Sequence, residues 1–279
     1  MGEAGRALSV TLTQMRATGD LNANLGAIRT LVREGAESGS DLVLLPEYAL
    51  HAGSPREMRE KKLTLASDPI RAVAKLAREF GVVVVLGGVK LGEASGRFTN
   101  SALAFSDRGE LLARYDKAHL FRATVAGAHY GPTEEDIAGD HLSLFDLKGV
   151  KIGMTICFDV RFPELFRHLA AEGADIVLVP SSFTRVTGRA HWSPLLRARA
   201  IDNQIFILAS ATVGAAEQPD SDALATYGHA MTVGPWGEIL ADLGDAALAS
   251  RTLKIPLDQL EEVRTRLPLR LCPRPFETL

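Results

Sequence analysis

The sequence predicts an α/β protein in which two β-sheets pack face to face between outer layers of helices, as a four-layer α-β-β-α sandwich. Two observations support this prediction. Short runs rich in β-branched residues alternate with longer segments of helical periodicity along the 279 residues, which is the pattern of α/β proteins. The second half of the chain also repeats the order of segments found in the first half. Such a repeat predicts two similar halves with internal pseudo-twofold symmetry.

Strands and helices follow from the spacing of apolar residues, with a period of two in strands and about 3.6 in helices. The predicted strands are residues 8–14, 42–46, 82–89, 100–105, 152–157, 176–180, 205–212 and 229–233. The predicted helices are residues 21–38, 69–80, 163–172 and 191–203. Asp20 can cap the first helix at its N-terminus, and Gly39 and Gly81 stand where C-terminal glycine caps belong.

The internal repeat consists of three matched pairs of segments. Ser-Asp-Leu-Val-Leu-Leu-Pro at 40–46 resembles Ala-Asp-Ile-Val-Leu-Val-Pro at 174–180. The other pairs are 82–89 with 205–213 and 102–112 with 230–240. Strand ends from opposite halves are therefore expected to meet at one cleft. Because no flexible linker divides the chain, residues 1–279 are treated as one domain.

Composition argues against several classes of partner and cofactor. Lys plus Arg total 31 against 34 Asp plus Glu, a net charge of −3, which gives no electrostatic reason to expect a nucleic acid or a membrane surface. No apolar run has the length of a membrane span and no signal peptide is evident, so a cytoplasmic protein is expected. Two cysteines and seven histidines without ligand spacing indicate neither a disulfide framework nor a metal site, and no cofactor motif is present.

Cys157 is the candidate nucleophile. It closes the apolar strand 152–157, and a proline that can begin a helix follows shortly afterwards. At such a turn the sulfur can lie beside free backbone N–H groups, which can lower the thiol pKa and stabilise an oxyanion. The alternative is a buried, inert thiol. The polar neighbours Asp159 and Arg161 weigh against that alternative.

Two charged residues are candidates for proton transfer and charge stabilisation. Glu47 closes an almost entirely apolar strand, where a carboxylate is unusual unless it is paired or faces a polar site. It could take a proton from a thiol and return it to a leaving amine. Lys117 could hold a carbonyl oxygen and stabilise a tetrahedral intermediate. Taken singly, each residue is also compatible with an exposed loop position.

Together these three segments resemble the signature motifs of the nitrilase superfamily of carbon–nitrogen hydrolases. The motifs are Pro-Glu-Tyr at 46–48, Asp-Lys-Ala-His-Leu at 116–120 and Cys-Phe-Asp-Val-Arg-Phe-Pro-Glu at 157–164. Further similar stretches lie at 180–192, 195–204 and 227–237. The resemblance implies the α-β-β-α sandwich and the hydrolysis of nitriles, amides or carbamoyl groups without a metal or organic cofactor.

The resemblance also implies roles for the matched residues. Cys157 would attack the carbonyl carbon, Glu47 would act as base and then acid, and Lys117 would stabilise the oxyanion. The backbone N–H of Phe158 would be a second oxyanion donor. Because a glutamate serves as the base, His119 is expected to be structural or to lie beside the substrate.

Other residues are expected to support the reaction. Members of the superfamily hold a second glutamate in the pocket, for which Glu134 is the preferred candidate and Glu135 the alternative. Asp159 and Arg161 are expected to fix the cysteine turn by ion pairing, outside direct contact with substrate.

The expected substrate-pocket residues are Tyr48, Thr184, Arg185 and Trp192, although Trp192 could equally be a packing residue. Arg185 and Arg189 are expected in one pocket loop, where a guanidinium that faced the cleft would favour a substrate carboxylate.

The stretches at 180–192 and 227–237 are most similar to the branch that includes omega-amidases and deaminated-glutathione amidases. They predict hydrolysis of a small, carboxylate-bearing amide through a cysteine thioester, with release of ammonia or an amine. The alternatives are an N-carbamoyl amino acid or amine hydrolase, a nitrilase, and an inactive scaffold or binding module of the same fold. The resemblance further implies a homodimer or larger homo-oligomer, with segment 256–279 over the surface or a partner subunit.

Overall fold

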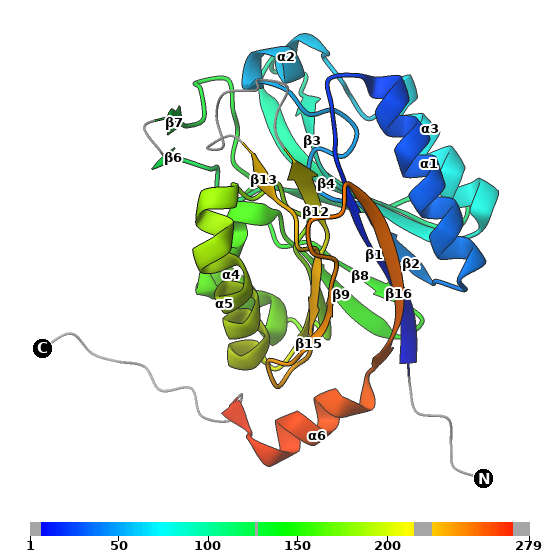
Figure 1. Cartoon of the computed structure of the whole chain (residues 1–279), viewed down its shortest axis with the longest axis vertical. Coiled ribbons are helices and arrows are strands. Elements are labelled where there is room, and N and C mark those ends of the chain that lie inside the picture. The colour runs from blue at the N-terminus through cyan, green and yellow to red at the C-terminus, as the bar shows by residue number, and fades with distance from the viewer. Residues whose placement is uncertain (1–6, 126–127, 215–224, 270–279) are drawn as a thin grey trace, which may run out of the picture.

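Four layers make up the computed structural model, which describes residues 7–125, 128–214 and 225–269 (Figure 1). Two helices cover the outer face of each sheet, and the inner faces of the sheets pack against each other. The helices over the first sheet are α1 (Leu21–Glu37) and α3 (Asp68–Phe80), and those over the second are α4 (Pro163–Ala171) and α5 (Arg185–Asn203). The predicted α-β-β-α sandwich is confirmed.

The strands of the first sheet are β1 (Ala7–Met15), β2 (Leu42–Leu44), β3 (Val83–Gly92), β4 (Phe98–Phe105), β5 (Leu111–Asp116), β12 (Ala211–Gly214), β13 (Thr226–Tyr227) and β16 (Leu248–Pro256). Those of the second sheet are β8 (Leu144–Leu147), β9 (Val150–Met154), β10 (Ile176–Leu178), β11 (Phe206–Ala209), β14 (Met231–Val233) and β15 (Ile239–Asp242). The remaining elements are the pair β6 (Ala123–Val125) and β7 (Ala128–Tyr130), the helices α2 (Pro55–Glu60) and α6 (Asp258–Arg266), and the 3₁₀ helix η1 (Cys157–Arg161).

The predicted repeat is present in the topology of both sheets. In the first half β1, β2 and β3 are parallel neighbours, and β4 and β5 follow antiparallel. In the second half β9, β10 and β11 are parallel, and β14 and β15 follow antiparallel. Because the two halves share this order, β1, β2 and β3 correspond to β9, β10 and β11, and the segment that leaves β2 has its counterpart in the segment that leaves β10.

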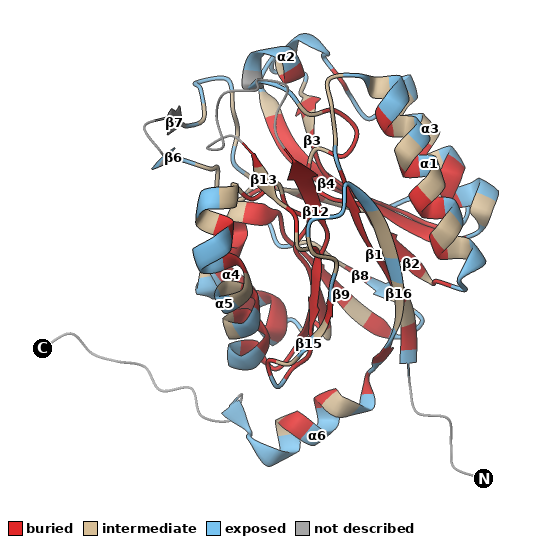
Figure 2. Cartoon of the chain, viewed as in Figure 1, coloured by how far each residue is buried: buried red, intermediate tan, exposed pale blue. Residues whose placement is uncertain are grey.

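Buried residues lie on the strands and on the inward faces of the helices (Figure 2), and their apolar side chains form two clusters that hold the layers together. One cluster joins strands of both sheets to α4 and α5, and the other fills the space between the first sheet and α1 and α3. Helix α3 contributes Ile70, Val73, Leu76 and Ala77 to the second cluster, whereas its opposite face is exposed. Burial of a large aliphatic side chain such as Ile70, Val73 or Leu76 contributes on the order of 2 kcal/mol. This packing fixes the strand ends from which the candidate site is built.

The prediction of one strand over residues 205–212 is wrong. The segment divides at Ser210, so that β11 lies in the second sheet and β12 in the first. The buried Ser210 hydroxyl donates to the carbonyl of Leu44 at 2.7 Å and accepts the N–H of Thr13 at 3.0 Å. The chain therefore crosses from the second sheet to the first at Ser210, whose hydroxyl forms hydrogen bonds with strands of the first sheet. Apolar spacing alone does not reveal this crossing.

Several elements were not predicted because they carry a weak apolar pattern. Strand β16 is mostly exposed or half-buried, yet it pairs with β1 over all nine residues from Ala7 to Met15.

Within the segment 256–279, α6 packs through Leu260 and Val263, while residues 270–279 lie outside the described part of the chain. No helix among the described residues has the length and apolar character needed to cross a membrane.

Candidate active site

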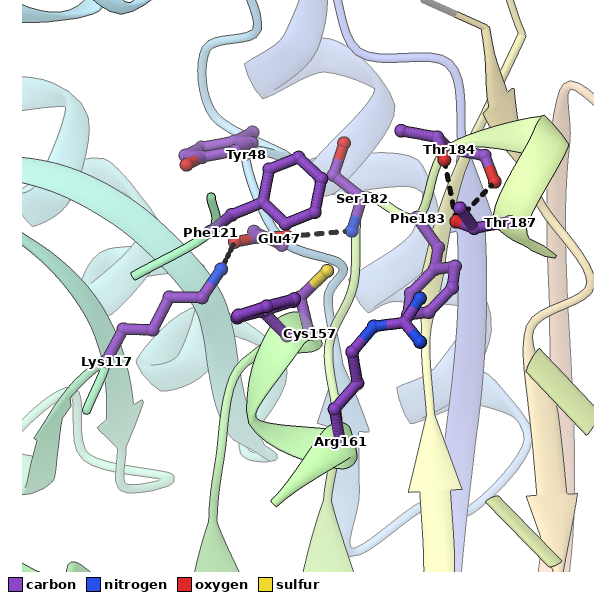
Figure 3. A pocket seen from close by; sticks show the side chains of 11 residues that line it. Glu47, Tyr48, Lys117, Phe121, Cys157, Arg161, Ser182, Phe183, Thr184 and Thr187 are labelled. Carbon is purple, nitrogen blue, oxygen red and sulfur yellow. Dashed lines mark hydrogen bonds and ion pairs between the residues drawn. The ribbon is translucent and has the colours of Figure 1, made fainter. Parts of the chain in front are cut away.

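Glu47 is a buried carboxylate just beyond β2, with 1% of its surface exposed. Its Oε1 accepts Lys117 Nζ at 2.8 Å, and its Oε2 accepts the N–H of Ser182 at 2.8 Å (Figure 3). Oε1 also accepts Asn100 Nδ2 at 2.9 Å. A carboxylate this deeply buried is tolerated only when it is paired and hydrogen-bonded. Glu47 is therefore a fixed group inside the fold, which excludes the exposed loop position.

Two adjacent glycines of β3 permit close packing around Glu47 and the segment beside it. A Cβ at Gly88, which has φ +65°, would lie 2.8 Å from Glu47 Cγ. A Cβ at Gly87 would lie 2.1 Å from Pro180 Cβ, in the opposite half of the chain. A side chain at Gly87 would push the two halves apart where they meet, and one at Gly88 would displace Glu47, so the Gly-Gly pair permits close packing at both contacts.

Lys117 follows β5 and is 3% exposed. Its backbone N–H donates to Asn100 O at 2.8 Å, and its carbonyl accepts the N–H of Gly139 at 3.0 Å. Burial alone would favour the neutral amine, but the Glu47 carboxylate, followed by weaker negative partners, raises the Lys117 pKa above its ordinary value. The side chain is therefore a charged ammonium ion held beside Glu47.

Cys157 begins η1 and has a left-handed backbone conformation with φ +49°. Strand β9 ends at Met154, before the end of the predicted strand at 157. Cys157 N–H donates to Pro180 O at 3.0 Å, which ties the turn to the segment after β10. Residues other than glycine adopt this conformation at an energetic cost, and such strained residues are enriched at active sites. The turn directs the sulfur into the space beside Glu47 and Ser182 (Figure 3).

The thiol of Cys157 is neutral in this environment. Burial and the neighbouring Glu47 carboxylate raise the pKa of Cys157 to about 12, against the opposing effects of the Lys117 ammonium and the Ser182 N–H. A backbone N–H does lower the thiol pKa, but desolvation is the larger effect and the net shift is upward. A neutral thiol requires a base before it can attack a carbonyl carbon, and Glu47 lies beside it.

This raised pKa predicts a pH dependence of stability. The ordinary thiol pKa is 9.0 and the folded value is about 12, so the contribution is complete below pH 9 and is lost as the pH rises toward 12. Between about pH 7 and 10 the wild-type protein should lose roughly 1 kcal/mol more unfolding free energy than Cys157→Ala. Urea unfolding of both proteins at the two pH values measures this difference. Equal losses would contradict the buried neutral thiol.

Asp159 holds the cysteine turn by hydrogen bonds. The fully buried carboxylate accepts Ile156 N–H at 2.9 Å, Tyr115 OH at 2.8 Å, and both the backbone N–H and the ring Nδ1 of His119 at 3.0 and 2.8 Å. The His119 ring stacks on Phe162 with centroids 3.6 Å apart. Asp159 thus supports the turn, as expected. It does so through these hydrogen bonds, whereas the expectation was an ion pair with an arginine. His119 has a structural position.

A small cleft of about 80 Å³ lies over the sulfur (Figure 3). Its lining residues are Glu47, Tyr48, Lys117, Phe121, Cys157, Phe158, Arg161, Ser182, Phe183, Thr184 and Thr187. The structure therefore brings together the three expected charged and nucleophilic residues, with Phe158, Tyr48 and Thr184 beside them. No group of three or more His, Cys, Asp or Glu among the described residues is placed to hold a metal ion.

Arg161 belongs to the cleft wall, which corrects its expected supporting role. Its guanidinium lies 5.0 Å from the centroid of the Phe183 ring and donates to His191 Nδ1 at 3.2 Å. The η1 turn carries Arg161 to the cleft side of the chain, where burial lowers its pKa from the ordinary value. A partly desolvated guanidinium of this kind is a good partner for a carboxylate.

Arg185, Arg189 and Trp192 do not line the cleft. Helix α5 begins at Arg185, six residues before the predicted start, so the expected pocket loop is helical. Arg189 is exposed on this helix. Trp192 is fully buried, its Nε1 donates to His229 O at 2.8 Å, and it packs on Phe183. It is therefore a core residue.

The second pocket glutamate is not found where the sequence suggested it. Glu134 and Glu135 are both exposed, and neither is among the residues that line the cleft. Glu135 pairs with Arg59 at 2.9 Å. The largely buried acid of this segment is Asp136, which pairs with Lys90 and with Arg59.

Asn100 and Ser182 were not anticipated from the sequence. Asn100 is a buried polar residue on β4, a position that apolar spacing assigns to the core. Ser182 donates its backbone N–H to Glu47. Almost any residue type could make this bond, so the amino acid at position 182 does not indicate it.

Comparisons with known proteins agree with this geometry. The carbon-nitrogen hydrolase family matches residues 9–265. Deaminated glutathione amidase of Yersinia enterocolitica is 38% identical, over 94% of this chain and 91% of the relative. Omega-amidase NIT2-B of Xenopus laevis is 32% identical, over 94% and 93%. The crystal structure of Saccharomyces cerevisiae Nit3, a member of branch 10 of the nitrilase superfamily, has a TM-score of 0.84 and 28% identity, with 95% of each chain covered. The chain therefore belongs to the carbon–nitrogen hydrolase family of the nitrilase superfamily, as an enzyme of the amidase class.

Proposed function

We propose that this enzyme hydrolyses the amide bond of a small molecule that also carries a carboxylate, with release of ammonia or an amine. The presence of the Arg161 guanidinium in the same cleft as the Cys157 sulfur is the observation that carries this proposal. The charged lining residues are Lys117, Arg161 and Glu47, two cations against one anion. A substrate carboxylate would neutralise the excess positive charge. The substrates named for the amidase relatives, deaminated glutathione and omega-amides, give the class from which candidates are drawn.

In the acylation step, Cys157 Sγ attacks the carbonyl carbon while Glu47 takes the thiol proton. Negative charge develops on the carbonyl oxygen, toward which the Lys117 ammonium and the backbone N–H of Phe158, at the start of η1, act as donors. The carbon–nitrogen bond breaks, Glu47 passes its proton to the leaving nitrogen, and the acyl group stays on sulfur as a thioester.

In the deacylation step, water attacks the thioester carbon and Glu47 takes one of its protons. The same donors stabilise the second oxyanion, the carbon–sulfur bond breaks, and Glu47 returns a proton to the sulfur. The products are a carboxylic acid and the neutral thiol. Since the pKa of Cys157 is about 12, protonation of the departing sulfur by Glu47 is an important part of this step.

The role of Arg161 is tested with Arg161→Leu. We expect KM for a carboxylate-bearing amide to rise about 10- to 100-fold, the range given by loss of a hydrogen-bonded charge partner. An uncharged amide of equal length should be affected much less, because it makes no ion pair. Ammonia release measured for both substrates gives the two KM values.

Arg189→Leu is the matched control, since this exposed arginine lies outside the cleft lining. It should retain wild-type kinetics. An equal effect of Arg161→Leu on charged and uncharged amides would contradict carboxylate recognition.

Ammonia release from N-carbamoyl amino acids and from nitriles is measured in the same assay. Release from nitriles alone would contradict the proposed amide substrate. Assembly as a homo-oligomer and a cytoplasmic location stay predictions.

A further inference from the structure

We infer that Asn100 is a positioning residue for the general base, acting through Glu47, an inference that rests on the role proposed above for Glu47. Asn100 lies on β4 and is 3% exposed. Its Nδ2 donates to Glu47 Oε1 at 2.9 Å and to Tyr48 OH at 3.1 Å. Asn100 is absent from the cleft lining, so its side chain acts on the reaction through Glu47 and Tyr48.

The contacts at Glu47 divide its two oxygens into different roles. Oε1 accepts both Lys117 Nζ and Asn100 Nδ2, whereas Oε2 accepts the N–H of Ser182. Each carboxylate oxygen has about two acceptor positions. Oε1 is therefore filled, and Oε2 retains a position for the proton of Cys157. By occupying Oε1, Asn100 fixes which oxygen takes part in proton transfer and how the carboxylate faces the thiol.

The orientation of the Asn100 amide leaves one of its own atoms unpaired. Oδ1 is buried and has no hydrogen-bond partner in the described structure. It lies against Gly88, where an added Cβ would be 3.0 Å away. Reversing the amide would direct this oxygen toward the Glu47 carboxylate and replace a hydrogen bond with repulsion. Since buried polar atoms are nearly always paired, the unpaired Oδ1 indicates that the contact to Glu47 determines the orientation.

Only the side chain of Asn100 carries this function. Its backbone carbonyl accepts the Lys117 N–H at 2.8 Å, and that bond does not depend on the residue type at position 100. A substitution therefore removes the donor to Glu47 while leaving the backbone of Lys117 in place. This separation allows the side-chain contribution to be measured alone.

The test is Asn100→Leu, which has similar size and no donor. We expect kcat to fall about 10- to 100-fold, the range for loss of a hydrogen bond to a charged group, with KM little changed. The acidic limb of the kcat/KM profile, measured between about pH 5 and 9, should move to higher pH because the ionised carboxylate has lost a donor. Asn100→Ala, which adds no apolar bulk, should change both quantities in the same direction.

Asn203→Leu is the matched control, because it removes another buried amide, whose Nδ2 donates to Arg199 O at 2.9 Å in α5. It should lower the melting temperature without moving the pH profile. Wild-type kcat and pH profile in either folded Asn100 variant, or an effect on KM alone, would overturn the inference. Glu47→Gln is measured in parallel: full activity in that variant would show that the proposed function itself is wrong.

Discussion

Cys157→Ala is expected to abolish amide hydrolysis and to leave the fold intact. The sulfur forms the covalent intermediate, so the intermediate cannot form without it. We therefore expect kcat to fall by about 10⁴-fold or more. The side chain is small and 7% exposed, and its replacement creates little cavity. Ammonia release measures the loss of activity, and thermal unfolding of the same preparation shows that the protein is folded.

Cys272→Ala is the matched control for this experiment. It replaces the other cysteine of the chain, which lies outside the described residues, and should retain wild-type activity. In that background, acid quenching during turnover followed by mass spectrometry should find the acyl group on Cys157. Full activity of Cys157→Ala would contradict the thioester mechanism. A wild-type protein that hydrolyses none of the tested amides, N-carbamoyl amino acids or nitriles would instead favour the inactive scaffold.

The sequence was sufficient to predict the layers and the three central residues, through apolar spacing together with the resemblance to the family motifs. Glu47 and Cys157 lie at the ends of strands that apolar spacing identified. Lys117 follows β5, which was not predicted, and it was identified because residues 116–120 resemble a family motif. The repeat then indicated that strand ends from the two halves correspond. Glu47 and Cys157 do line one cleft, although the strands before them, β2 and β9, correspond to β10 and β1 in the repeat.

The rest of the site depends on features that spacing does not encode. Arg161 reaches the cleft because η1 is a 3₁₀ turn that begins with a left-handed residue. Ser182 acts through its backbone, and Asn100 acts from a strand position that pattern analysis assigns to the core. Strand β16 was missed because its side chains are mostly exposed or half-buried, so the strand carries little apolar pattern, although it pairs with β1 along its full length.

The same buried geometry makes Lys117→Met a test of both stability and catalysis. Lys117 and Glu47 are 3% and 1% exposed and are joined at 2.8 Å. Removing the ammonium leaves Glu47 with the Asn100 and Ser182 donors but without its cation. Loss of one partner of a buried pair typically costs about 3–5 kcal/mol, and urea unfolding should show a decrease of that order. Turnover should also be lost, with kcat affected more than KM, because the oxyanion contact strengthens as charge develops.

A double-mutant cycle separates the pair from its individual charges. Glu47→Gln with Lys117→Met leaves neither charge unpaired, so its loss of stability should be smaller than the sum of the two single losses. Lys148→Met is the matched control: this lysine pairs with Asp41 at the surface, and its removal should cost about 1 kcal/mol or less. Additive losses in the double variant would show that the two charges are not coupled. Coupling in stability, together with equally complete inactivation of all three variants, would identify Glu47 and Lys117 as one buried catalytic unit.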